Sequence, residues 1–189
     1  IALGATGAFA ATEGTDNAGN YGGTWTNGNN GGTLGTFAPW DLTNNNNNNT
    51  DTFAGYFLGD STAGTGDINT GGVSFAIYAN PGNAFADALR NFGSPLSVGQ
   101  TFSLDVAVNF RNGNKGFSLF DGATEIFNLN VGSDDYQING VSIGAPYSST
   151  AIFNLSLTQP SAGPGPSSVF SNGTGRPSST THPGLSSGS

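Results

Sequence analysis

The sequence predicts an all-β protein, an antiparallel jelly-roll-like β-sandwich, and three observations favour this fold class. Short segments alternate apolar and polar residues with a period of two, as strands with one buried face do. Asn-Gly and Asp-Gly dipeptides separate these segments, and they tolerate the positive φ angles of tight hairpins. Fourteen Phe residues supply much of the bulk of the expected core.

The clearest alternation covers residues 101–110. It sets five apolar side chains on one face, namely Phe102, Leu104, Val106, Val108 and Phe110. A helix would scatter these side chains around its whole circumference. The pattern therefore predicts a half-buried strand.

Shorter segments extend this pattern along the chain. Strands are predicted over residues 73–79, 125–131, 136–138, 141–143 and 151–157, and over 53–58, whose continuous apolar run suggests burial on both faces. The turns expected at Asn112-Gly113, Asp121-Gly122 and Asn139-Gly140 predict an antiparallel meander over residues 101–157. Residues 84–91 are the one helical candidate, of about two turns.

Composition divides the 189 residues into three parts. Residues 15–158 are the predicted β-sandwich domain, and residues 1–14 are an N-terminal extension. Residues 159–189 are rich in Pro, Ser, Gly and Thr, as linkers and disordered tails are. The run of asparagines at 44–49 is expected at the tip of a loop.

Charged residues make up 8% of the chain, against roughly 25% in ordinary soluble domains, which favours an extracellular or cell-surface location. The net charge is −8 and the four bases form no dense patch, which argues against binding to nucleic acid or an anionic membrane. No run approaches the ~18 apolar residues of a membrane span. Without cysteine, disulfides and thiolate metal sites are excluded.

Catalytic residue types are scarce. The only histidine is His182, in the Pro- and Ser-rich tail, and a Ser-His-Asp arrangement would have to include it. A glycosidase needs only two carboxylates, and the candidates are Asp105, Asp121, Glu125, Asp134 and Asp135. Each has a simpler role on a polar strand face or in a turn. The sequence therefore predicts a non-enzymatic protein.

The N-terminal extension alternates weakly. Ile1, Leu3, Ala5, Gly7 and Phe9 share one side of an extended chain. A strand of this kind can complete the open sheet of a neighbouring subunit, as donor strands do in pili. It can equally fold back on the edge of its own sheet, and the sequence leaves both alternatives open.

Three further sets of residues are candidate sites. Calcium would suit the oxygens of Asp60, Asp67 and Asn69, which otherwise serve local turns, and no other cofactor is expected. A glycan would suit the aromatic rings of Trp25, Tyr56 and Tyr78, although core packing is the simpler role for each ring. The N-glycosylation pattern occurs at Asn48, Asn154 and Asn172, in a chain where chance matches are expected.

Six segments carry a resemblance to a known type of domain. They are residues 17–25 (NAGNYGGTW), 37–42 (FAPWDL), 57–61 (FLGDS), 68–80 (INTGGVSFAIYAN), 99–117 (GQTFSLDVAVNFRNGNKGF) and 148–159. Together they resemble a repeated, lectin-like β-sandwich domain of secreted or surface proteins from environmental bacteria. The resemblance implies an extracellular, non-catalytic role. It also implies further strands after Gln159, where the sequence departs from the pattern.

Two functions follow as hypotheses. The first is a structural subunit that binds copies of itself by strand complementation and forms a filament or surface layer. The second is a carbohydrate-binding module, calcium-dependent or not. The alternating extension and the expectation of an incomplete sheet favour the first.

Overall fold

Antiparallel strands make up the described secondary structure of this computed structural model, apart from the short 3-10 helices η1 (Ala18–Tyr21) and η2 (Ser61–Ala63). The structure describes residues 14–46, 52–80, 83–111, 113–131 and 134–160, and the backbone of 168–172. The strands are β1 (Asp41–Asn44), β2 (Phe53–Gly59), β3 (Ser74–Asn80), β4 (Ala86–Asn91), β5 (Thr101–Ala107), β6 (Gly116–Asp121), β7 (Thr124–Asn130), β8 (Asp135–Ile138), β9 (Val141–Pro146), β10 (Ile152–Thr158) and β11 (Ser168–Asn172). The predicted all-β class is confirmed.

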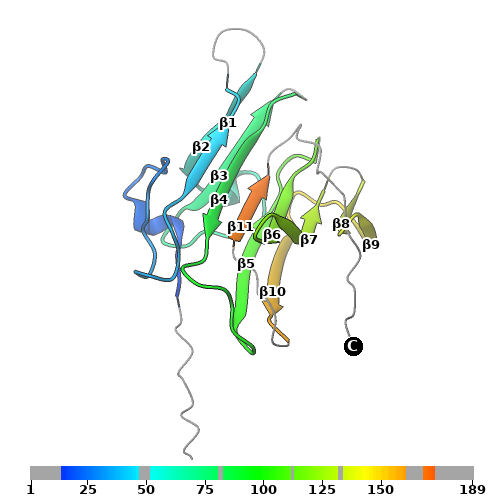
Figure 1. Cartoon of the computed structure of the whole chain (residues 1–189). Helices are drawn as coiled ribbons and strands as arrows, with labels where there is room; N and C mark the ends of the chain where they lie inside the picture. The colour runs from blue at the N-terminus through cyan, green and yellow to red at the C-terminus, as the bar shows by residue number, and fades with distance from the viewer. Residues whose placement is uncertain are drawn as a thin grey trace, which may run out of the picture.

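The strands form one large sheet and two small ones. The large sheet has seven strands in the order β1-β4-β11-β6-β7-β8-β9, and the small sheets pair β5 with β10 and β2 with β3. Figure 1 shows β11, in orange, between β4 and β6. The predicted meander is correct for β6 to β9 only, because β5 pairs with β10 instead of β6. The connection through Gly113 therefore leads from one sheet to another.

Both small sheets lie on the same face of the large sheet. Ala54 of β2 packs with Ala84 and Ala86, the second of which is in β4. Phe102 of β5 packs against the buried Phe117 of β6. Ala88 of β4 and Phe117 are both opposite Ser171 of β11, and directly paired residues point to the same side of a sheet. Ala86 shares the side of Ala88, so this face carries both clusters.

Residues 84–91, the helical candidate, instead form a strand. Ala86, Ala88 and Arg90 are buried on one side of β4, and Asp87 is buried on the other. Alanine and leucine favour helices by propensity, but a strand between β1 and β11 hydrogen-bonds along both edges. Pairing with strands distant in sequence therefore overrides the local preference.

Strand β2 is buried on one face, which corrects the prediction of burial on both. Ala54 is buried, whereas Phe53 and Phe57 are about half exposed on the outer side. The run is apolar throughout because aromatic residues remain on the exposed face of this small sheet.

Part of the predicted C-terminal tail belongs to the sheet. Residues 168–172 form β11 and pair in full with β4 and β6. The sequence Ser-Val-Phe-Ser-Asn has only two adjacent apolar residues and lacks the alternation that predicts a strand.

Candidate functional site

The five predicted donor-strand residues, Ile1, Leu3, Ala5, Gly7 and Phe9, lie outside the described residues. The structure describes the chain that follows them. It therefore defines the point at which the extension joins the domain, and the strand edges that such a segment would meet.

The extension joins the domain next to a buried ion pair. Arg90 of β4 pairs with Asp16, and the two side chains are 4% and 7% exposed. Arg90 Nε also donates a hydrogen bond of 2.8 Å to the carbonyl oxygen of Ala38, and the guanidinium lies 4.9 Å from the ring centroid of Phe37 and 5.0 Å from that of Trp40. Residue 16 is thereby fixed on the sheet.

Tyr21 completes this cluster. Its hydroxyl donates to Asp16 and accepts hydrogen bonds from Trp40 Nε1 at 2.8 Å and from the backbone of Gly31 at 3.1 Å. Burial, followed by the hydrogen bond to Asp16, raises the pKa of the Tyr21 hydroxyl. These hydrogen bonds connect the segment before β1 to Asp16 and, through it, to Arg90 of β4.

Strand β10 has a free edge among the described residues, because its only partner there is β5. Along β10, side chains that face the core alternate with exposed side chains. Phe153, on the inner side, packs on Tyr136 of β8 with a ring-centroid distance of 4.2 Å. Leu155 and Leu157 pack against the cluster around Phe117 and Leu119. An added strand would therefore find both unpaired backbone groups and an apolar floor.

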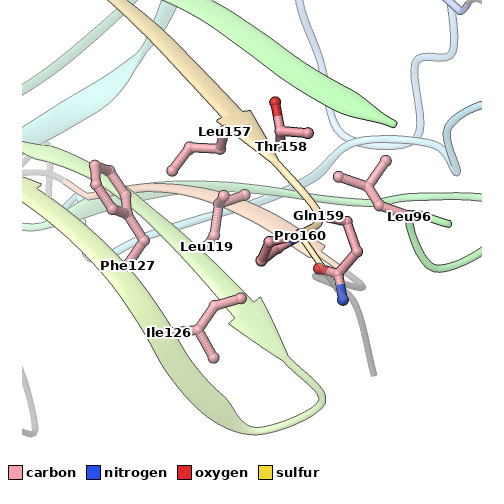
Figure 2. A pocket seen from close by; sticks show the side chains of 8 residues that line it. All are labelled: Leu96, Leu119, Ile126, Phe127, Leu157, Thr158, Gln159 and Pro160. Carbon is pink, nitrogen blue, oxygen red and sulfur yellow. The ribbon is translucent and has the colours of Figure 1, made fainter. Parts of the chain in front are cut away.

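An apolar pocket of about 200 Å³ lies at the C-terminal end of β10 (Figure 2). It lies between the layers and is lined by Leu96, Leu119, Ile126, Phe127, Leu157, Thr158, Gln159 and Pro160. A β-bulge between Leu119 and Phe120 shifts the register opposite Ile126. Bulges re-aim side chains, which explains how Ile126 joins Phe127 in the lining although the two are adjacent in sequence.

The calcium candidates are brought partly together. Asp60 Oδ1 accepts hydrogen bonds from the Thr62 backbone at 3.0 Å and from Asn69 Nδ2 at 2.7 Å. Asp67 Oδ1 accepts from the Asn69 backbone at 3.0 Å. Hydrogen bonds from Thr62 and then Asn69 lower the pKa of the Asp60 carboxyl. The carboxylates thus cap a turn, and no described cluster of three or more His, Cys, Asp or Glu could hold a metal ion.

The proposed sugar-stacking rings do not share a surface. Trp25 is 5% exposed and packs on the ring of Tyr56 at 5.6 Å. The Tyr56 hydroxyl donates to the carbonyl oxygens of Thr43 and Asp87, and burial raises its pKa to about 12. Tyr78 lies on the opposite, outer face of the β2–β3 sheet and is 46% exposed.

An exposed aromatic pair was missed by the sequence reasoning. Phe57 and Tyr78 are 48% and 46% exposed, and their ring centroids are 6.1 Å apart on the outer face of β2–β3. Tyr78 covers Gly55, where a Cβ atom would lie 2.9 Å from its hydroxyl. A signal was present in the sequence, since Phe53, Gly55 and Phe57 form the second side of a period-two strand.

The remaining candidates are dispersed. Asn154 donates to Asp105 at 2.6 Å on the exposed side of β5–β10, Asn172 lies at the end of β11, and Asn48 is outside the described residues, as is His182. The other carboxylates have local partners: Asp134 pairs with Arg111, Asp135 accepts from Ser142, and Glu125 accepts from Ser118. Asp121 ends β6 at its turn.

Comparison with family models, with curated proteins and with solved structures yields no match to this chain. In the described part of the chain, no helix has the length and apolar character needed to cross a membrane.

Proposed function

We propose that this protein is an extracellular structural subunit that assembles into a filament or surface layer by β-strand complementation. In this proposal the described strands belong to a jelly-roll-like, lectin-like sandwich, and residues 1–10 add to the edge of a neighbouring copy. The observation that carries the proposal is the free edge of β10, with its apolar floor and the pocket at its end. The proposal involves no catalytic step.

The β10 edge suits an added strand better than the outer strands of the large sheet. β10 has seven residues, and alternate side chains face the core. β9 and β1 are mostly exposed along their length, so a strand added there would cover little apolar surface. Main-chain hydrogen bonds supply affinity in strand addition, and pockets for alternate side chains supply specificity.

In the proposed register the added strand runs antiparallel to β10, as the strand pairs among the described residues do. Leu3 would lie beside Leu157, at the pocket. Ala5 and Gly7 would then lie beside the larger Leu155 and Phe153. A pocket of about 200 Å³ is below the roughly 300–1,000 Å³ of small-molecule sites and suits one aliphatic side chain.

The geometry of such a contact leads to a polymer. The donor segment and the acceptor edge are different surfaces of the same chain, so the interface is heterologous. A heterologous contact whose rotation does not close produces an open filament. Arg90 and Asp16 fix the start of the domain, which gives successive subunits a defined spacing.

The test compares Leu3→Asp with Thr6→Asp in the full-length chain by electron microscopy and sedimentation. Leu3 faces the pocket in the proposed register, and Thr6 faces solvent. We expect filaments or higher oligomers for the unmodified chain and for T6D, and monomers for L3D and for a chain lacking residues 1–10. Assemblies of normal yield from the deleted chain would overturn the proposal.

A second candidate function, binding of a neutral glycan, rests on the Phe57–Tyr78 pair. Exposed aromatic faces stack on sugars, and the two rings together offer a platform on one small sheet. The expected result is binding to a glycan array that Tyr78→Ala weakens and that Phe110→Ala, at an exposed position outside β2 and β3, leaves unchanged. An array without binding would remove this candidate.

A further inference from the structure

We infer that the slot between β4 and β6 is a second strand-exchange site, and that its occupant can be residues 168–172 of another copy of the chain. This inference is independent of the extension at residues 1–10. It rests on how β11 is held, on what holds the two walls of the slot, and on the segment that joins β11 to the domain.

Among the described strands, β11 alone joins the two halves of the large sheet by strand pairing. All five of its residues, from Ser168 to Asn172, pair with β4 on one side and with β6 on the other. Among the described strands, β4 pairs only with β1 and β11, while β6 pairs only with β7 and β11. Removing β11 would therefore leave a slot one strand wide, about 9–10 Å from β4 to β6.

The walls of this slot are held by contacts that do not involve β11. Wall β4 pairs with β1 and is fixed through the Arg90–Asp16 ion pair. Wall β6 forms a hairpin with β7, closed by Gly122 in a left-handed conformation at φ 57°. Each wall is thus paired with another strand, β4 with β1 and β6 with β7, independently of β11.

The second layer fixes the distance between the walls. Phe102 of β5 contacts Phe92, which follows β4, at a centroid distance of 5.4 Å. The same ring stacks on Phe117 of β6 at 5.7 Å with an interplanar angle of 13°. Phe102 therefore bridges the two walls across the floor of the slot. These ring contacts between the walls do not depend on β11.

The floor of the slot is mainly apolar, with the buried Arg90 at one position of β4, and the edges of the slot carry backbone groups in register. Ala88 of β4 and Phe117 and Leu119 of β6 are buried and flank the slot on its inner side. A strand that enters gains hydrogen bonds on both sides, whichever chain supplies it. The contacts of β11 with β4 and β6 are the same in both cases.

The segment that joins Pro160 to β11 influences whether the slot is filled by β11 of the same chain or by β11 of another copy. Residues 161–167 read Ser-Ala-Gly-Pro-Gly-Pro-Ser, and seven residues span at most about 25 Å. Within one chain, a short linker gives β11 an effective concentration in the millimolar range. Exchange between chains competes with pairing inside one chain when the chains fold together at a concentration close to this effective concentration. Such exchange of an identical element is a common route to oligomers.

The chain contains no cysteine, so introduced cysteines report this exchange cleanly. Asn91, an exposed residue of β4, is directly opposite Ser168. Directly opposite residues have Cα atoms about 4.5–5.5 Å apart, within the range of a disulfide. We propose to mix two full-length chains, Asn91→Cys and Ser168→Cys, refold them together at high concentration, and oxidise them.

We expect a covalent dimer in which a 91–168 disulfide joins the two chains. The matched control replaces Ser168→Cys with Ser97→Cys, an exposed loop serine outside the slot, and should give only background dimer. A double variant, N91C with S168C in one chain, tests the register by forming the disulfide internally in dilute solution.

Each outcome decides the inference. It is overturned if the double variant forms the internal disulfide while mixed chains yield no more dimer than the Ser97→Cys control. It is also overturned if the double variant forms no disulfide, because β11 then does not occupy the slot. The same mixing experiment with chains lacking residues 1–10 should still give the dimer, which separates this site from the proposed β10 interface.

Discussion

Arg90 and Asp16 are 74 positions apart in sequence and form an ion pair that the protein encloses almost completely. Three aromatic residues surround it, since Phe37 and Trp40 lie against the guanidinium and Tyr21 hydrogen-bonds to both charged groups. The pair connects the first described residues of the chain to a strand of the large sheet. Backbone hydrogen bonds from Ala38 N to Asn91 O at 2.9 Å and from Gly93 N to Thr36 O at 2.7 Å also hold residues 14–40 on the domain.

Replacing Asp16→Asn should lower the free energy of unfolding by about 3–5 kcal/mol, because it leaves the buried Arg90 charge without its anion. Asp134→Asn is the matched control. Its ion pair with Arg111 is exposed, at 47% and 89%, and its loss should change stability by less than about 1 kcal/mol. Urea unfolding of both variants measures the difference. Equal effects would show that Asp16 does not neutralise a buried charge.

Phe102→Ala should destabilise the protein by up to about 3–5 kcal/mol, the cost of truncating a fully buried aromatic residue, because this partly buried ring packs against the buried Phe117. The ring contacts Phe92 and Phe117, so its loss also loosens the distance between β4 and β6. Hydrogen exchange should show faster opening of β11 in this variant. Phe110→Ala, at a ring that is 70% exposed, should leave both stability and exchange nearly unchanged.

The free energy of unfolding should depend on pH through the titration of Lys115. Burial lowers the pKa of its ammonium group to about 8, whereas a lysine in the unfolded chain has its ordinary pKa of 10.5. Between these values the unfolded state binds more protons, so stability should rise with pH from about 8 towards 10. Lys115→Gln should remove this rise. The comparison should stop below pH 10, because above it the raised pKa of Tyr56 makes stability fall with pH.

Calcium should not change the melting temperature. The oxygens of Asp60, Asp67 and Asn69 already accept hydrogen bonds from Thr62, Asn69 and Ser61. A ligand that binds the folded state raises its stability, so a calcium site would appear as a shift between chelator and excess calcium in a thermal scan. A calcium-dependent shift that Asp60→Asn abolishes would restore this loop as a metal site.

Strands with one buried face were predictable from the sequence, and the pairing of distant strands was not. The alternation of Phe102, Leu104 and Val106 predicts β5, and the Asn139-Gly140 turn, with φ angles of 50° and 77°, joins β8 to β9 as expected. Periodicity identifies a strand but does not name its partner. The choice of β10 over β6 as the partner of β5 therefore required the structure.

The buried polar cluster was equally outside the reach of pattern reasoning. Arg90 is one of only four basic residues in the chain and follows a run of small and apolar residues. That position is a signal, because an arginine within an apolar strand needs a partner. The identity of the partner, Asp16, depends on a loop path that no local rule fixes. The same limit hid β11, whose residues lack the alternation of a half-buried strand and pair with β4 and β6, which lie far earlier in the sequence.

The position of β11 in the chain has a consequence for timing during synthesis. β4 and β6 both precede it, so the slot can form before the strand that fills it has been made. Residues 161–172 must be added after Pro160, and at roughly 5–20 residues per second this takes on the order of a second. For that interval, nascent chains made close together on one messenger would present open slots to one another.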